Sequence, residues 1–151
     1  MKVLILLGSK SDLDSFKGCG EYLDKFGIEY KQEVSSAHRQ AEKTTRLINE
    51  AEAEGCRIII AGAGMAAHLP GVVASQTILP VIGVPLAGSA LSGVDALYSV
   101  VQMPAGIPVA CTAIGSHGAK NAAILAAEIL ALNDEDIKAK LLDLRKEMAE
   151  A

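Results

Sequence analysis

Short apolar runs alternate with segments of helical periodicity along the chain, and this alternation limits the folds that are open to it. The run 58–61 is Ile-rich and not alternating, which is typical of a buried strand, whereas 28–34 alternates and suits a position nearer the sheet edge. The predicted strands are residues 3–7, 28–34, 58–61, 80–84 and 109–114. Strand–helix units joined by short turns predict an α/β fold with a parallel central sheet, helices on both faces and right-handed crossovers.

The length of 151 residues is typical of one domain. We expect residues 1–132 to form a single α/β catalytic domain and residues 133–151 to form a C-terminal helix that Asn133 or Asp134 caps. This last helix is amphipathic and charged, so it could pack on a neighbouring subunit or fray, and its sequence leaves both options open. The segment 119–132 is a helix that is apolar nearly all round and must be covered on both sides, which again argues for neighbouring subunits.

The composition favours self-association. Hydrophobic residues make up 50% of the chain but aromatic residues only 3%, so the apolar excess is aliphatic and alanine. Small, flat apolar surfaces suit subunit contacts, and a monomer of this size would leave much of such surface exposed to water. We therefore expect a homo-oligomer.

Charge and cysteine content exclude several classes of partner and compartment. The net charge is −4 and no basic run is longer than two residues, which argues against binding to nucleic acid or to an anionic membrane. Cys19, Cys56 and Cys111 are odd in number and widely spaced, as expected of free thiols in a reducing cytosol. The apolar run 3–7 is too short for a signal peptide. We expect a cytoplasmic protein.

The turns that follow the predicted strands are the candidate site, because ligands of parallel sheets bind beyond the carboxyl ends of the strands. These turns are residues 8–12, 35–39, 62–71 and 85–93. Three of the four are rich in Gly, Ser and Ala, and between them they carry His38 and His68. The third histidine, His117, is expected in a surface loop.

The turn 62–71 combines small residues with one ionisable side chain. Glycine and alanine leave room for a backbone or a ligand to approach closely, and His68 is the only titratable group among them. The alternative interpretation is a helix start that carries a surface histidine.

The turn 8–12 offers backbone N–H groups, two serine hydroxyls and Asp12 at a predicted helix N-terminus, where anions bind. Helix capping by Ser11 or Asp12 is the alternative. The turn matches neither a P-loop nor a dinucleotide fingerprint, so a ligand with one phosphate fits better than a triphosphate or dinucleotide.

The turn 35–39 places an imidazole beside a guanidinium. Arg39 could clamp a phosphate or carboxylate through two contacts, and His38 could exchange protons near neutral pH. The alternative is an exposed capping turn with a solvated arginine.

Five motifs occur together and in order between residues 2 and 132. They are Gly8-Ser9-Lys10-Ser11-Asp12, Ser36-Ala37-His38-Arg39, Ala61-Gly62-Ala63-Gly64 with Ala66-Ala67-His68-Leu69-Pro70-Gly71, Ala90-Leu91-Ser92-Gly93-Val94-Asp95 and Val101-Gln102-Met103-Pro104. As a set they resemble the N5-carboxyaminoimidazole ribonucleotide mutase family of purine biosynthesis. Five ordered motifs are specific, whereas one alone would not be.

The resemblance implies a flavodoxin-like three-layer αβα sandwich, assembled as a homo-octamer with sites at subunit junctions. It implies an imidazole ribonucleotide substrate whose carboxyl group moves from the exocyclic nitrogen to ring carbon 4 through enclosed CO2. His38 would transfer the proton, and the loop with His68 would close over the base, so both are candidate catalytic residues. The implied substrate-binding residues are Gly8, Ser9, Ser11, Asp12, Ser36, Ala37, Arg39, Gly64, Ala66, Ala67 and Leu69.

The implied chemistry suits these residue types. A carbamate falls apart once its nitrogen is protonated, and a group with a pKa near 7 can donate that proton and later remove one from carbon 4. The reaction requires no metal, nucleotide or redox cofactor. A partner synthetase could supply the unstable carbamate.

The chain departs from the family pattern at several positions. Gln40-Ala41 replaces the usual Thr-Pro, Met65 stands where a second glycine is usual, residues 87–89 are less polar, and the C-terminus is short. Met65 could narrow the CO2 pocket or point inward. Two other functions remain open, namely direct carboxylation of aminoimidazole ribonucleotide by CO2 and a non-catalytic module that binds a nucleotide monophosphate. The sequence His68-Leu69-Pro70-Gly71 favours the mutase over the direct carboxylase.

Overall fold

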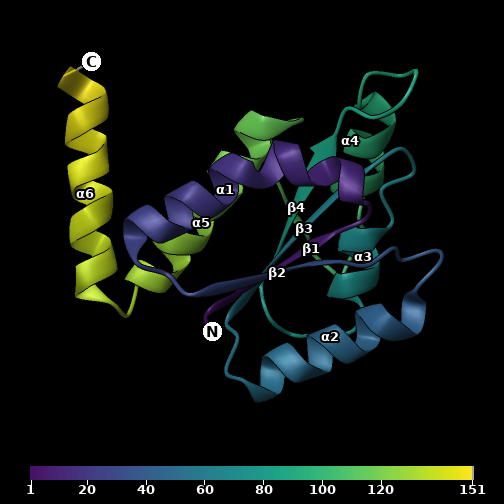
Figure 1. Ribbon diagram of the computed structural model, residues 1–151, viewed down its shortest axis with the longest axis horizontal. Coiled ribbons are helices and arrows are strands. Elements are labelled where there is room, and N and C mark those ends of the chain that lie inside the picture. The colour runs from purple at the N-terminus through teal and green to yellow at the C-terminus, as the bar shows by residue number, and fades with distance from the viewer. Residues whose placement is uncertain (151) are drawn as a thin grey trace.

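The computed structural model describes residues 1–150 and contains a five-stranded parallel sheet with strand order β2-β1-β3-β4-β5 (Figure 1). The strands are β1 (Val3–Leu7), β2 (Tyr30–Val34), β3 (Ile58–Gly64), β4 (Val81–Leu86) and β5 (Ala110–Cys111). This order, with its reversal beside β1, is that of flavodoxin-like folds. It confirms the predicted fold class, and the alternating segment 28–34 does supply an edge strand.

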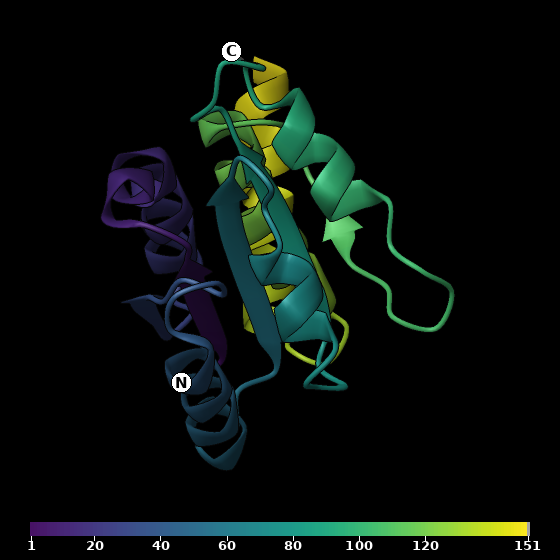
Figure 2. The same ribbon diagram turned by 90° about the vertical axis from the view of Figure 1, so that its right-hand side faces the viewer.

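Helices cover both faces of the sheet and make three layers (Figures 1 and 2). The helices are η1 (Lys10–Asp12), α1 (Leu13–Phe26), α2 (Ala41–Ala53), α3 (Leu69–Ala74), α4 (Val94–Val101), α5 (Ser116–Ala131) and α6 (Glu135–Glu150). One apolar core lies between the sheet and α1, α5 and α6, and a second lies between the sheet and α2, α3 and α4. The buried aliphatic side chains of β1, β3 and β4 therefore point into one core or the other.

Strand β1, which lies between β2 and β3, is buried along its full length, with Ile5 facing the first core and Leu6 the second. Its last residue, Leu7, is level with Val34 of β2 on one side and Gly62 of β3 on the other. The strands run in one direction, so the turns that leave β1, β2 and β3 emerge next to one another. This register places the residues that follow the three strands around one site.

Gly62 shows why a glycine is needed where β3 passes α1. A Cβ atom at this position would collide with the ring of Phe16, which is fully buried. Phe16 and Gly62 thus form a matched pair that lets α1 lie close to the sheet. Gly27 has a different role, because it ends α1 in the left-handed conformation with φ 70°.

Several predicted boundaries were wrong. β3 extends to Gly64 and β4 to Leu86, because these residues pair with each other in parallel register, while β5 keeps only two residues. His117, predicted in a loop, lies in the first turn of α5 and is exposed there. The helix begins earlier than its apolar pattern because Gly115, with φ 80°, turns the chain directly into it.

The C-terminal helix α6 packs on its own chain. Asp134 accepts a hydrogen bond from the Ile137 N–H at 3.2 Å, as a capping residue does, and Leu141 and Leu144 are buried against the first core. Both α1 and α6 pack against α5, so this chain itself covers parts of the helix for which neighbouring subunits were expected. The predicted segment ended at Ala151, which lies outside the described residues. Within residues 1–150, no helix has the length and apolar character needed to cross a membrane.

Candidate active site

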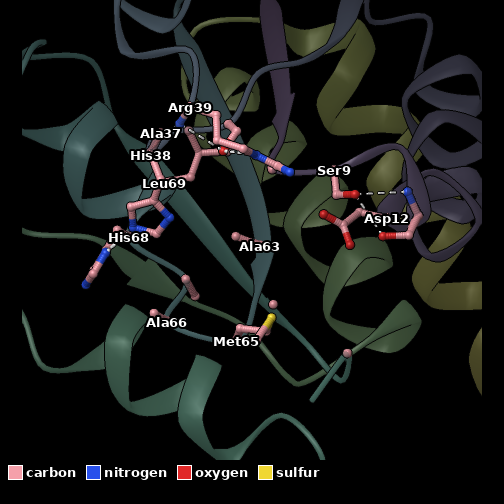
Figure 3. Close-up of a pocket in the computed structure, with 16 residues that line it drawn as sticks. Ser9, Asp12, Ala37, His38, Arg39, Ala63, Met65, Ala66, His68 and Leu69 are labelled. Carbon is pink, nitrogen blue, oxygen red and sulfur yellow. Dashed lines mark hydrogen bonds between the residues drawn. The ribbon is translucent and has the colours of Figure 1, made fainter.

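A cavity of about 370 Å³ opens at the carboxyl ends of β1, β2 and β3 (Figure 3). Every site residue predicted from the sequence lines it, from Gly8 in the first turn to Leu69 at the start of α3. Three further residues line it that were not predicted as site residues, namely Ala63, Met65 and Gly88. The structure thus brings three distant motifs together around one space.

The first turn presents hydroxyl and carboxyl groups to this cavity. Ser9 Oγ accepts hydrogen bonds from Ser11 N–H at 3.3 Å and from Ser11 Oγ–H at 2.9 Å, so Ser9 caps η1. The side chain of Asp12 makes no capping hydrogen bond to α1. Capping by Ser11 or Asp12, the alternative considered from the sequence, is therefore wrong. Burial raises the pKa of the Asp12 carboxyl above its ordinary value.

The second turn holds Arg39 by its ε nitrogen. Ser36 is buried, and its Oγ accepts hydrogen bonds from Arg39 N–H at 3.3 Å and from Arg39 Nε–H at 3.4 Å. Within residues 1–150, no carboxylate lies within ion-pair distance of the guanidinium. The terminal nitrogens of Arg39 are thus oriented for a two-point contact with an incoming anion.

The third turn has an unusual backbone. Met65 and Ala67 have φ values of 54° and 30°, in the left-handed region that favours glycine. The turn is closed by a hydrogen bond of 3.0 Å from Ala67 N–H to Gly64 O. The side chain of Met65 is 63% exposed and lines the cavity, so it does not point into the core. Of the two positions considered from the sequence, the structure supports the one that narrows the pocket.

The two histidines meet across the cavity mouth. His38 Nε2 and His68 Nδ1 lie 2.5 Å apart, with the ring planes edge to face at 81° (Figure 3). Only one proton fits between these nitrogens, so one ring donates and the other accepts. The sequence did not predict this contact.

The fourth predicted turn contributes little. Of the loop after β4, only Gly88 lines the cavity, while Ser89 donates its hydroxyl to Asp95 at 2.8 Å at the start of α4. His117 lies outside the cavity lining. Among residues 1–150, no group of three His, Cys, Asp or Glu side chains is arranged to hold a metal ion.

The family model of AIR carboxylase matches residues 2–151. The chain belongs to the AIR carboxylase family. The match covers all three turns of the cavity, so the motifs that face one another in space are part of a single family pattern. The family predicted from the five motifs is thereby confirmed.

Relatives within this family are similar over nearly the whole chain. The proteins named N5-carboxyaminoimidazole ribonucleotide mutase from Vibrio vulnificus and from Pyrococcus abyssi are 52% identical over 151 residues and 51% identical over 147 residues. These alignments cover 100% and 97% of this chain, and 94% and 83% of the relatives.

Solved structures support the same fold. A crystal structure of Treponema denticola PurE matches with a TM-score of 0.89 and 34% identity, covering 98% of this chain and 91% of that chain. A 3-dehydroquinate dehydratase-like protein from Bifidobacterium longum matches with a TM-score of 0.56 and 18% identity, covering 87% of this chain and 99% of that one. The second likeness concerns the fold alone.

Proposed function

We propose that this chain is the mutase of purine biosynthesis that converts N5-carboxyaminoimidazole ribonucleotide into its isomer carboxylated at carbon 4. The observation that carries the proposal is the meeting of His38 and Arg39 with His68 around one cavity, in a chain about half identical to proteins named for this reaction. A proton carrier beside an anion-binding guanidinium is what the isomerisation of a nucleotide monophosphate needs.

The ribose phosphate binds between the first two turns. Arg39 contacts the phosphate, since its terminal nitrogens are not engaged by Ser36. Ser9 and Asp12 lie on the side toward which the Arg39 side chain extends, away from the two histidines, and contact the ribose phosphate portion from there (Figure 3). The backbone N–H groups of Gly8 and Ser11 are already bonded within the protein, to Gly62 O at 3.0 Å and to Ser9 Oγ at 3.3 Å, so the side chains of this turn make its contacts with the substrate.

The imidazole portion then lies beside the two histidines. His38, as an imidazolium, protonates the carbamate nitrogen, the bond between that nitrogen and the carboxyl carbon breaks, and CO2 is released. Carbon 4 of the resulting aminoimidazole attacks CO2, and neutral His38 removes the proton displaced from carbon 4. The reaction returns the proton it used, so one group that first donates and then accepts a proton performs both steps.

The third turn keeps CO2 close to the base. Gly64, Ala66 and Ala67 offer little side-chain volume, which leaves space for the base and for CO2. Residues 68–71 close over the base and CO2. This closure prevents the escape of CO2, which would replace an intramolecular transfer with a slower bimolecular one. His68 orients the base and holds the closed position through its contact with His38.

The assembly is a cytoplasmic homo-octamer with sites at subunit junctions. In support of association, α4 exposes Val94, Tyr98 and Val101 at helical spacing, and Ile78 and Leu132 are 101% and 80% exposed. A synthetase supplies the carbamate, and the enzyme uses no cofactor, nucleic acid or membrane partner.

The decisive test compares two substrates. The purified protein is incubated with the carbamate nucleotide and, separately, with aminoimidazole ribonucleotide, each with and without bicarbonate. Conversion of the carbamate that does not depend on bicarbonate supports the mutase. Conversion of aminoimidazole ribonucleotide only, in proportion to bicarbonate, would establish direct carboxylation. Binding of both nucleotides without any carboxyl transfer would establish a non-catalytic module.

A further inference from the structure

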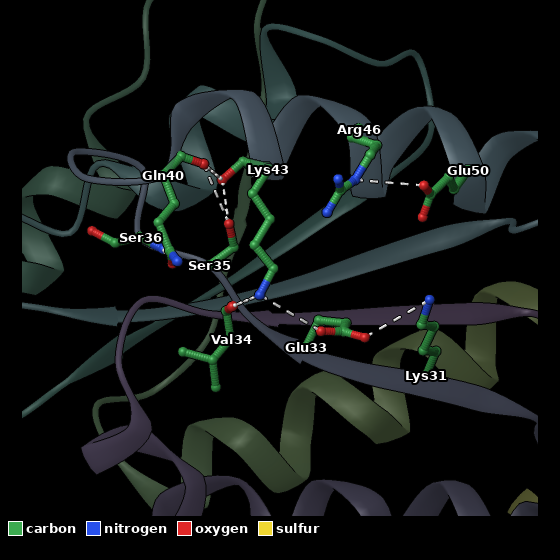
Figure 4. Close-up of polar contacts among 10 residues, drawn as sticks. Lys31, Glu33, Val34, Ser35, Ser36, Gln40, Lys43, Arg46 and Glu50 are labelled. Carbon is green, nitrogen blue, oxygen red and sulfur yellow. Dashed lines mark hydrogen bonds and ion pairs between the residues drawn. The ribbon is translucent and has the colours of Figure 1, made fainter.

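Gln40, which directly follows the second turn, is hydrogen-bonded to both main-chain groups of Ser36 (Figure 4). The Ser36 N–H donates to Gln40 Oε1 at 3.2 Å, and the Gln40 N–H donates to Ser36 O at 2.8 Å. One contact uses the side chain and the other the main chain. Together they close a ring around residues 36–40, the segment that carries His38 and Arg39.

The position of Ser36 in turn determines the position of Arg39. Ser36 Oγ accepts from both the main-chain N–H and the Nε–H of Arg39, at 3.3 and 3.4 Å. A rotation of Ser36 would therefore move the guanidinium away from the cavity. Gln40 reaches the anion-binding group through two consecutive contacts, without lining the cavity itself.

The other side of Gln40 is anchored in the protein. Its carbonyl oxygen accepts hydrogen bonds from Thr44 N–H at 3.0 Å and from Thr44 Oγ1–H at 3.3 Å. Thr44 Oγ1 also lies 2.8 Å from Ser35 Oγ, and Thr44 and Ser35 are both fully buried. The main chain of Gln40 is thus fixed to α2. The hydrogen bond from Ser36 N–H to the Gln40 side chain then fixes the position of Ser36 relative to the same helix.

The residue type matters because Gln40 precedes the first residue of α2. Ser, Thr, Asp or Asn at such a position would bond to the free N–H groups of the helix. The Gln40 side chain makes no such capping bond and instead bonds to Ser36. The following residue is Ala41 and not a proline with fixed φ, so the backbone there has less intrinsic rigidity.

We propose that Gln40 is a positioning residue whose side-chain amide holds the turn of Ser36 and Arg39 in its phosphate-binding shape. The proposal rests on the proposed function, in which Arg39 binds the substrate phosphate. A phosphate contact is made equally in the ground state and the transition state, so its weakening raises KM and leaves kcat nearly unchanged. One hydrogen bond of this kind accounts for about a threefold to tenfold change.

The test uses Gln40→Met, which keeps the side-chain length and removes the strong acceptor, in the full chain. We expect KM to rise about threefold to tenfold with kcat within about twofold. The inhibition constant of ribose 5-phosphate, used as a probe of the phosphate site, should rise in parallel. Gln32→Met is the matched control, because Gln32 is exposed and its side chain has no hydrogen bond within residues 1–150; both constants should keep their values.

A second variant separates positioning from folding. Gln40→Thr combined with Ala41→Pro replaces the side-chain contact with a rigid backbone and a helix cap, and it should restore both constants. An unchanged KM and inhibition constant in Gln40→Met would overturn the proposal. So would a loss of kcat at constant KM, because that pattern indicates a smaller fraction of folded enzyme. Absence of turnover in the unmodified protein would contradict the proposed function and not the role of Gln40. In that case, direct binding of ribose 5-phosphate to the unmodified protein and to Gln40→Met would replace the inhibitor titration.

Discussion

The second and third turns meet at the contact between His38 and His68, but they are built in opposite ways. The second turn is held by side-chain and main-chain hydrogen bonds among residues 36–40. The third turn contains two non-glycine residues, Met65 and Ala67, with positive φ, and one hydrogen bond from Ala67 to Gly64 closes it. Strain of this kind concentrates at sites that rearrange or are preorganised for function.

This difference assigns different tasks to the two turns. A hydrogen-bonded turn suits side chains that must stay in a fixed position relative to the charged groups of the substrate. Arg39 and the proton carrier His38 are such side chains. A turn of small residues in a strained conformation suits a segment that closes over a ligand. The two histidines should therefore respond differently to substitution.

The largest expected effect is that of His38→Asn. Loss of the proton carrier should reduce kcat by about 10²- to 10⁴-fold, while binding of the nucleotide product, measured by calorimetry, stays close to that of the unmodified protein. Asparagine keeps a polar side chain at the position, so the hydrogen bonds of Ser36 and Arg39 should persist. Turnover near the normal rate would remove His38 from the mechanism.

His68→Ala should have a smaller effect. Closure and orientation of the base would be impaired, and we expect kcat/KM to fall about 10- to 100-fold. Proton exchange at carbon 4, followed by loss of label from the product, should continue because His38 is still present. If exchange stopped as completely as in the His38 variant, the two histidines would share one task and the proposed difference between the turns would be wrong.

Met65→Gly tests the strain in the third turn. Glycine adopts a φ of 54° without the steric cost that other residues incur, and the exposed Met65 side chain contributes little packing. The free energy of unfolding should rise by up to about 1 kcal/mol in denaturant titrations. Ala66→Gly is the control, since Ala66 does not have a positive φ and glycine there should lower stability. Equal changes in the two variants would mean that the turn stores no strain at Met65.

Much of the site could be predicted from the sequence because parallel strands end at one edge. Gly8, Ser36 and Gly64 are far apart in the chain, yet each follows or ends a strand, and the topology alone brings them around one cavity. The bounds of β1 were likewise predicted correctly, since a short apolar run between polar segments marks a buried strand.

The remaining features depend on interactions between segments. Residues 62–64 were predicted as a turn because they are glycine and alanine, but pairing of Gly64 with Leu86 of β4 extends the strand. The contact between His38 and His68 depends on strand register and side-chain rotamers, neither of which a local pattern contains. The hydrogen bond from Ser36 N–H to the Gln40 side chain could not be predicted either, because glutamine is not a usual capping residue and no motif predicts where its amide points.

The smallest expected effect concerns Asp12, in the first turn, which adjoins both others. Burial raises the pKa of its carboxyl, so the folded state binds this proton more tightly than the unfolded state does. Stability of the ligand-free protein therefore falls as pH rises through the ordinary aspartate range and the raised folded pKa. Asp12→Asn removes this penalty and should be slightly more stable than the unmodified protein at pH 7, with the difference disappearing at a pH below that range. Denaturant titrations at several pH values, without nucleotide, measure the two curves. A variant that is less stable at pH 7 would show that the hydrogen bonds of the Asp12 carboxylate with Ser9 and Ser11 outweigh the cost of its burial.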